Sequence, residues 1–281
     1  MQIGEQIRTL RKKQGLTQAA LAEKLYVTPQ AVSQWERGTT IPDMEKLADI
    51  AAVLHSTPNM LTGEENPGKD WNIADTPFSP EHMYSRLVST AQIEKLSETY
   101  AALPYMKEKH AGQTRKPTLF SGKPVPYIVH PLTMACHAHA LGIREDKILA
   151  TVLLHDVCED CGVTPEELPF SAEVREAVRL LSFQIKPGET RAEAKKRYYA
   201  AIAENRIARI VKILDCCNNI SAMASSFSQK KLISYIDETE TYVMPMLDRA
   251  KYAIAEYADA FYLLKYHMVS VLESIKAMAA R

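Results

Sequence analysis

Apolar residues recur along most of this chain at the three- and four-residue spacing of helices that bury one face. Near the N-terminus the spacing predicts three short helices, over 3–11, over 18–22 after the cap Thr17, and over 29–37 after the cap Thr28. From residue 81 onward the helical period dominates, and alternating β-branched positions are few. The pattern therefore predicts an all-α protein, with two or three further helices in the last 55 residues.

One stretch interrupts the helical pattern and divides the chain. Residues 63–79 are rich in glycine and proline, which often mark loops and linkers. We therefore expect a small domain over 1–62, a linker over 63–79 and a larger helical domain over 80–281. A length of 281 residues, 46% of them hydrophobic, is enough for both cores.

Composition argues against export and against a membrane protein. The N-terminus has no apolar leader, and no apolar run approaches the ~20 residues that span a bilayer. Five cysteines, an odd number without a disulfide framework, fit a reducing compartment. We expect a cytoplasmic protein with no membrane partner.

The richest candidate chemistry directly follows the apolar run 148–154. On a helix His155 and Glu159 would share one face, and Asp156 and Asp160 would repeat that spacing one residue later. Polar groups at the end of a buried helix need partners, and a divalent cation would be a sufficient one. The segment is therefore typical of a catalytic metal site.

Three other motifs accompany this one along the chain. They are an HxGQxRK-type segment at 110–116, a PYIxHP segment at 126–131 and a KxxDxxxN segment at 212–219. With the LLHDVxED segment at 153–160, they resemble the hydrolase domain of the RelA/SpoT homologues. These are HD-superfamily enzymes that remove the 3′-pyrophosphate of the alarmone (p)ppGpp. The resemblance covers about residues 100–222 and implies an alarmone hydrolase.

The resemblance also implies a role for individual residues. The implied ligands of a single Mn²⁺ are His130, His155, Asp156 and Asp215. The residues implied to position and deprotonate the attacking water are Glu159 and Asp160. The implied nucleotide contacts are Arg115, Lys116 and Asn219. Two imidazoles and two carboxylates suit Mn²⁺ and leave coordination positions open for water and a phosphate oxygen.

Some of these residues also have simpler explanations. His130 precedes a proline and could cap a helix, and Asn219 could be an ordinary surface amide. Tyr127 is expected to pack against the pocket wall. His137 and His139 lie two residues apart, on different faces of a helix, so a structural role is favoured over chelation of one ion.

Cysteines near the motifs raise a rival reading as a thiolate zinc site. The four candidates are Cys158, Cys161, Cys216 and Cys217. Cys216 and Cys217 are adjacent, and two adjacent cysteines can bind one ion only with strain. Cys158 and Cys161 lie on or just after a helix rather than on the knuckle turn typical of a zinc site. Small packing thiols are therefore the favoured interpretation.

Two departures from the family pattern bear on the substrate. The family usually has a basic residue after the late aspartate and a threonine three residues past the asparagine, where this chain has Cys216 and Ala222. The nucleotide contacts must differ in part, so a phosphatase of NADPH or of a nucleoside phosphate stays open. A nucleotide-sensing regulator with little catalysis is a further alternative, against which the intact Glu159 and Asp160 argue.

The first 62 residues carry a second pattern, LTQAALA…VTPQAVSQWERG…IPDMEKLADIA, which resembles the Xre/Cro-type helix-turn-helix. The resemblance implies that the third helix enters the major groove of double-stranded DNA. The implied base contacts are Thr28, Gln30, Ser33 and Gln34, and Gln18 is the implied phosphate contact. Val32 and Trp35 are assigned to the core of the module.

Charge and symmetry qualify this interpretation. Positive charge would come from Arg8, Arg11, Lys12 and Lys13. The formal net charge of the chain is zero, which leaves open a module that contacts only protein. Because one such module reads only half of an operator, we expect a homodimer, with the helices after Phe227 as the pairing surface.

Overall fold

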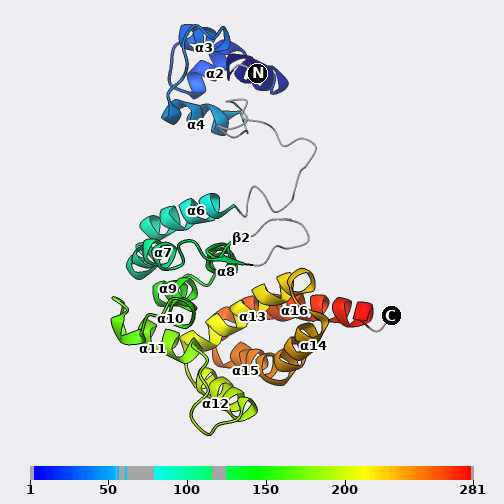
Figure 1. Ribbon diagram of the computed structural model, residues 1–281. Helices are drawn as coiled ribbons and strands as arrows, with labels where there is room; N and C mark the ends of the chain where they lie inside the picture. Colours follow the sequence, from blue (N-terminus) through cyan, green and yellow to red (C-terminus); the bar gives the residue numbers. More distant parts are fainter. Residues whose placement is uncertain (1–2, 55, 57–60, 62–78, 116–124, 280–281) are drawn as a thin grey trace. The chain divides into compact units, whose positions relative to one another are not determined.

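Two compact units, residues 1–71 and 72–281, make up the computed structural model of the protein (Figure 1). The structure describes residues 3–54, 56, 61, 79–115 and 125–279. The boundary between the units falls within the expected linker 63–79, of which residues 63–78 lie outside the described residues.

The described part of the first unit contains α1 (Ile3–Lys13), α2 (Gln18–Lys24), α3 (Pro29–Glu36) and α4 (Met44–Val53). The hydroxyl groups of Thr17 and Thr28 accept backbone N–H groups at 3.0 and 3.2 Å, which confirms both predicted caps. Val32 and Trp35 are buried in the core, as the sequence predicts. A Cβ atom at Gly4 would lie 2.2 Å from the carbonyl oxygen of Trp35, so only glycine permits this close approach of α1 to α3.

A buried ion pair joins α1 to α3. Arg11 donates from Nε to Glu36 Oε1 at 2.5 Å and from a terminal nitrogen to Glu36 Oε2 at 2.9 Å. The guanidinium also donates to the carbonyl oxygen of Leu16 at 2.7 Å, and the Gln18 amide donates to Glu36 at 2.8 Å. The expectation that Arg11 adds positive charge for DNA is therefore wrong, because the carboxylate of Glu36 already neutralises it.

In the residues that the structure describes, the second unit is helical apart from two strands of two residues each. Its first helices are α6 (Pro80–Ile93), α7 (Ser97–Lys109), α8 (Val129–Ala140), α9 (Asp146–Leu154), α10 (Val157–Asp160) and α11 (Ala172–Leu181). A single 3-10 turn, η1 (Pro165–Glu167), precedes α11. The hairpin pairs β1 (Thr114–Arg115) with β2 (Val125–Pro126) in antiparallel register. The all-α fold class is confirmed.

The remaining helices are α12 (Arg191–Glu204), α13 (Arg206–Ser226), α14 (Gln229–Glu238), α15 (Met244–Ala253) and α16 (Ala258–Ala279). A π-helical turn, η2 (Thr239–Val243), carries α14 directly into α15, and a 3-10 turn, η3 (Ala255–Tyr257), precedes α16. The segment after Phe227 thus forms the helices that its periodicity predicts.

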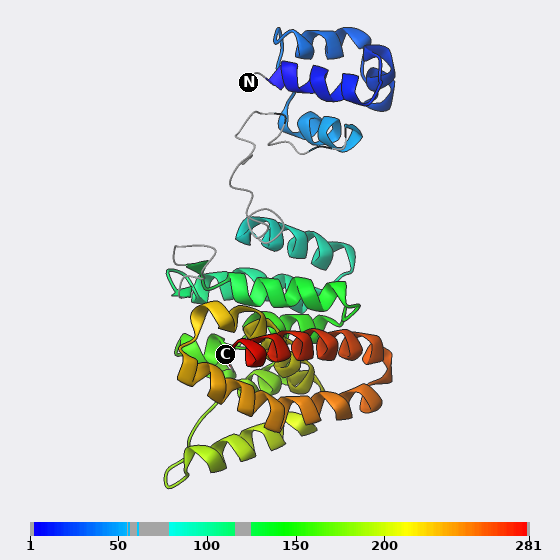
Figure 2. The ribbon, with the colours of Figure 1, turned by 90° about the vertical axis from the view of Figure 1, so that its right-hand side faces the viewer.

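Helix α13 is the centre of the second unit. It packs against α8, α9, α11, α12, α15 and α16, and Figure 2 shows the neighbouring helices around it. Its apolar side chains Ile210, Ile213 and Ile220 are fully buried. Asp215 on the same helix is buried among them, so α13 is a firm support for this side chain. None of the helices that the structure describes combines the length and apolar composition needed to cross a bilayer.

Candidate active site

Three backbone segments bring the predicted metal ligands together. His130 lies in the first turn of α8, His155 and Asp156 follow the end of α9, and Asp215 lies on α13. The expectation of one continuous helix through 155–160 is wrong: α9 ends at Leu154 and α10 begins at Val157. The turn has a clear effect, because consecutive residues of a helix point about 100° apart, whereas here His155 and Asp156 face the same point.

The four side chains form a compact cluster. His130 Nε2 lies 3.2 Å from Asp215 Oδ1, and His155 Nε2 lies 3.0 Å from Asp156 Oδ2. Each of the two crossed imidazole–carboxylate distances is 3.8 Å. His130, His155 and Asp215 are buried, and one potential ligand atom from each lies within 4.8 Å of the others. The structure thus brings the four predicted ligands together, and three of them, without Asp156, form the group of potential ligand atoms.

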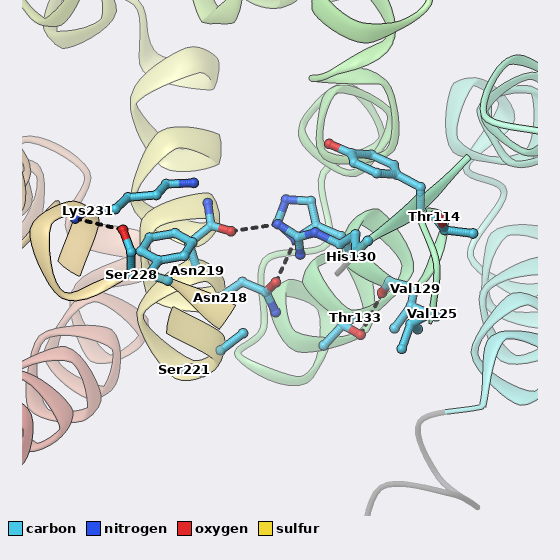
Figure 3. A pocket seen from close by; sticks show the side chains of 14 residues that line it. Thr114, Val125, Val129, His130, Thr133, Asn218, Asn219, Ser221, Ser228 and Lys231 are labelled. Carbon is cyan, nitrogen blue, oxygen red and sulfur yellow. Dashed lines mark hydrogen bonds between the residues drawn. The ribbon is translucent and has the colours of Figure 1, made fainter. Parts of the chain in front are cut away.

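Hydrogen bonds fix the direction in which both imidazoles present a lone pair. The Nδ1 atom of His155 donates to the carbonyl oxygen of Val152 at 2.9 Å. The Nδ1 atom of His130 bonds to Asn218 Oδ1 at 2.6 Å, as Figure 3 shows. A neutral imidazole that donates from Nδ1 carries its lone pair on Nε2, so both lone pairs face the carboxylates. Sequence reasoning missed Asn218, although its i+3 spacing from Asp215 places it on the same side of α13.

Electrostatics show what this cluster lacks. Burial by itself would lower the pKa of His155, but the nearby carboxylates of Asp156 and Asp215 outweigh it and raise that pKa to about 9. His155 Nε2 is buried and has no hydrogen-bond partner, although Asp156 Oδ2 lies only 3.0 Å away. A proton or a cation must therefore relieve the repulsion between lone pairs and carboxylates. A donor set of two nitrogens and two carboxylates fits a divalent cation.

Lys212 neutralises part of the charge of the cluster. Its Nζ lies 3.0 Å from Asp215 Oδ2. Burial would raise the pKa of Asp215, but Lys212 and His130 outweigh that effect and hold it well below its usual range. Sequence reasoning quoted Lys212 only as part of a motif and gave it no role, although its i−3 spacing from Asp215 was visible.

The four side chains of the cluster line a cavity of about 420 Å³, and Glu159 and Asp160 lie at its rim. The Glu159 carboxylate accepts the backbone N–H of Phe183 at 3.1 Å. Partial burial raises the pKa of Glu159, and the charges of Asp156 and Asp160 add to the effect. A carboxylate with a raised pKa beside a candidate metal centre can take a proton from water.

The predicted nucleotide contacts also reach this centre. An Arg115 guanidinium nitrogen donates to Asn219 Oδ1 at 2.9 Å, and Asn219 Nδ2 donates to Asp215 Oδ1 at 2.7 Å. The Arg115 guanidinium lies 5.7 Å from the centre of the Tyr127 ring. The remaining predicted contact, Lys116, lies outside the described residues.

Tyr127 does more than pack. Its ring stacks on His110 with the centroids 4.6 Å apart, and its hydroxyl group donates to Asp156 Oδ2. The prediction of a packing role was therefore incomplete. The hydrogen bond orients one carboxylate of the cluster, and nothing in the sequence around Tyr127 points to it.

A second cavity, of about 520 Å³, adjoins the first. Both cavities are lined by Arg115, Tyr127, His130, Asn219 and Lys231. The walls of the second are more apolar and include Val125 and Val129, labelled in Figure 3, as well as Phe227. The two cavities together form one elongated site with a charged end and an apolar end.

The rival thiolate site finds no support in the described residues. There, the one cluster of potential metal ligands contains no cysteine. Cys216 and Cys217 are buried, with Cys216 Sγ 3.4 Å from the Thr239 hydroxyl oxygen. His139 Nε2 lies 2.9 Å from Glu94, away from the centre, which agrees with a structural role.

The residues predicted to contact DNA lie on α2 and α3. Gln30 and Gln34 are exposed, and Ser33 is half-buried. Thr28 caps α3 with its hydroxyl oxygen. Gln18 is turned toward Glu36, so the backbone N–H groups at the start of α2 are better placed than its side chain to meet a phosphate.

Comparison with known proteins assigns the two units to different relatives. Residues 7–61 match the helix-turn-helix family model. A stretch covering 23% of the chain is 42% identical over 66 residues to the HTH-type transcriptional activator BcrR of Enterococcus faecalis, of which it covers 32%.

A larger part of the chain matches enzymes. It is 31% identical over 156 residues to a guanosine-3′,5′-bis(diphosphate) 3′-pyrophosphohydrolase of Aquifex aeolicus, a match that covers 54% of this chain and 21% of the relative. It is 32% identical over 158 residues to a GTP pyrophosphokinase of Myxococcus xanthus, covering 53% and 20%. The chain thus spans about a fifth of the length of these enzymes.

The fold and the site define an all-α protein with a buried centre of imidazoles and carboxylates in its second unit. By sequence, it has an Xre-type helix-turn-helix at the N-terminus, and its C-terminal half is homologous to (p)ppGpp 3′-pyrophosphohydrolases.

Proposed function

We propose that the protein is a metal-dependent (p)ppGpp 3′-pyrophosphohydrolase of the HD type, joined to a DNA-binding helix-turn-helix. The observation that carries the proposal is the cluster itself. Two buried imidazoles direct Nε2 lone pairs at two carboxylates, and two further carboxylates lie at the rim of the same cavity. A divalent cation would relieve the repulsion within such a centre, as a proton on His155 would, and the adjacent acids can transfer protons at a hydrolytic site.

His130, His155, Asp156 and Asp215 would hold the ion, with Mn²⁺ as the favoured species. When bound, a divalent ion lowers the pKa of water and polarises a phosphoryl oxygen. Glu159 and Asp160 orient the attacking water and accept its proton. Tyr127 and Asn219 hold the two ligand carboxylates in position through their hydrogen bonds. The products are pyrophosphate and GDP or GTP.

The two adjoining cavities fit a nucleotide that carries phosphates on both sides of its ribose. The apolar cavity suits the nucleoside, with Arg115 able to stack on a base or grip a phosphate. Three cations, Arg191, Lys195 and Lys231, line the cavity that holds the cluster and suit a polyphosphate. The cysteine and alanine that replace the family's usual contacts, Cys216 and Ala222, leave the base contacts to other residues.

The decisive experiment incubates the Mn²⁺-loaded protein with ppGpp, pppGpp and NADPH separately and identifies the products. We expect pyrophosphate from the first two and no phosphate from NADPH. Asp215→Asn serves as the inactive control, and Glu94→Gln, far from the centre, as the active one. Release of phosphate from NADPH alone would replace the alarmone with another nucleotide, and no turnover of any nucleotide would favour a sensor.

We further propose that the first unit binds double-stranded DNA as part of a homodimer in the cytoplasm. The free cysteines fit that compartment. The exposed side chains of Tyr262, Tyr266 and Val269 on α16 supply an apolar strip for pairing.

If nucleotide binding alters operator affinity, linkage requires DNA to alter nucleotide affinity by the same factor. A gel-shift titration of the Asp160→Asn protein with and without ppGpp tests this coupling.

A further inference from the structure

Tyr26, in the turn between α2 and α3, combines two unusual properties. Its backbone has a φ of +55°, the left-handed region that bulky residues rarely enter. Its side chain is 96% exposed. Among the described residues, only Lys95 is also a non-glycine residue with positive φ.

The backbone conformation has a local cause. Helix α2 ends with bonds from Tyr26 N to Glu23 O at 3.2 Å and from Val27 N to Ala22 O at 3.0 Å. In a helix that ends in this way, the residue after the C-cap, here Tyr26, adopts the left-handed conformation. Glycine is usual at that position because it has no Cβ atom. The hydrogen bonds explain the turn, but they do not explain a tyrosine.

Packing does not explain the tyrosine either. A ring that is almost fully exposed gains little from its own unit, so it does not offset the strain of its backbone. Residues strained without internal compensation tend to lie at functional sites. The side chain therefore calls for a partner outside the unit.

The position and surroundings of Tyr26 indicate which partner. It lies two residues before Thr28, the cap of the helix proposed to enter the major groove. Its exposed sequence neighbours Glu23, Lys24 and Thr28 are polar, which favours a polar partner over an apolar protein surface. A phenol hydroxyl is a good donor to a phosphate oxygen.

We propose that Tyr26 contacts the DNA backbone beside the recognition helix, its hydroxyl donating to a phosphate. This inference rests on the proposed DNA-binding function. The contact is independent of base sequence and adds affinity without adding charge.

The test begins with a pool of random duplexes about 30 base pairs long, room for two half-sites one turn apart. The full-length wild-type protein selects its preferred fragment. Affinities for that fragment and for a scrambled duplex are then measured for Tyr26→Phe and Tyr26→Gly. Lys95→Gly is the matched control, since it relieves the same backbone conformation in the other unit.

We expect Tyr26→Phe to bind about 10-fold more weakly, the size of a hydrogen bond to a charged group. Tyr26→Gly should lose at least as much, although its turn is relaxed. Both losses should be equal on the two duplexes, with an unchanged slope of affinity against salt, because no charge is removed. Lys95→Gly should bind as wild type does.

Wild-type affinity in both Tyr26 variants would overturn the inference while leaving DNA binding intact. A loss confined to the selected fragment would also overturn it, because it would make Tyr26 a base contact. If the wild-type protein enriches no fragment, the proposed DNA-binding function itself fails, and the inference fails with it.

Discussion

Each unit of the protein contains a buried polar cluster, and the two differ in one respect. In the first unit Arg11, Glu36 and Gln18 satisfy one another, with charges that balance and hydrogen bonds of 2.5–2.9 Å. In the second, His155 Nε2 is buried without a hydrogen bond among crowded carboxylates. The first cluster is complete by itself, whereas the second needs a proton or a cation to balance its carboxylates.

The difference separates stability from function. A complete buried ion pair fixes how helices pack, and removing one partner leaves an uncompensated charge. An incomplete cluster costs stability and is tolerated where a ligand completes it. Burial of charge alone therefore does not identify a functional site. In the second unit the unpartnered nitrogen of His155 lies beside two carboxylates that line a cavity, and this combination does.

The largest expected effect concerns the complete cluster. Glu36→Gln should destabilise the first unit by about 3–5 kcal/mol, because Arg11 stays buried without a counter-charge. Hydrogen exchange of the α1 and α3 amides in the full chain measures the loss. The double variant Arg11→Met/Glu36→Leu should recover most of it, and failure to recover would mean that the pair does more than balance charge.

The pH dependence of stability gives a second test of the pair of Arg11 and Glu36. Burial would raise the pKa of Glu36, but its hydrogen bonds from Arg11 and Gln18 outweigh that effect and lower it. Its stabilising contribution is therefore complete above the unfolded value of about 4.5 and is lost as the pH falls through the lower folded value. The difference between wild type and Glu36→Gln should shrink below pH 4.5.

Glu159→Gln is expected to have the next largest effect. Turnover should fall at least ~100-fold, the usual scale of general acid–base help, with metal and nucleotide binding retained. Steady-state kinetics and metal analysis measure the two properties. Glu166→Gln, an exposed change outside the cavity, is the control. Unchanged turnover would remove Glu159 from the mechanism.

The smallest effect concerns the incomplete cluster. Lys212 and a bound cation compete for the carboxylate of Asp215, so Lys212→Met should raise Mn²⁺ affinity about 10-fold, or ~1.4 kcal/mol. Competition with a fluorescent chelator measures it. Lys195→Met is the matched control variant, because Lys195 lines the same cavity but pairs with Glu238, at 2.6 Å, instead of with Asp215. Equal or weaker affinity in Lys212→Met would contradict the competition.

The sequence predicted the parts of the protein that depend on local spacing. The caps at Thr17 and Thr28 follow from short-range patterns. The convergence of His130 with Asp215, far apart in sequence, followed only from the resemblance of their motifs to a known family. The sequence did not predict the turn after Leu154, because every residue of 148–160 is compatible with a helix.

Partners distant in sequence were the least predictable. Asn218 bonds to an imidazole 88 residues away, and Arg11 to a carboxylate 25 residues away. Both were visible only as polar residues on helices. Their long-range partners depend on how helices pack, which periodicity does not determine.

Helix α13 carries Asp215, Asn218 and Asn219 within little more than one turn. In the proposed function the first would hold the ion and the third would line the nucleotide cavity, while the second bonds to the imidazole of His130. A helix moves as a rigid rod, so an ion that pins one of these side chains restricts the other two. The first ligand to bind then bears the entropy cost of ordering α13. The second ligand binds to a helix that is already ordered and therefore binds more tightly.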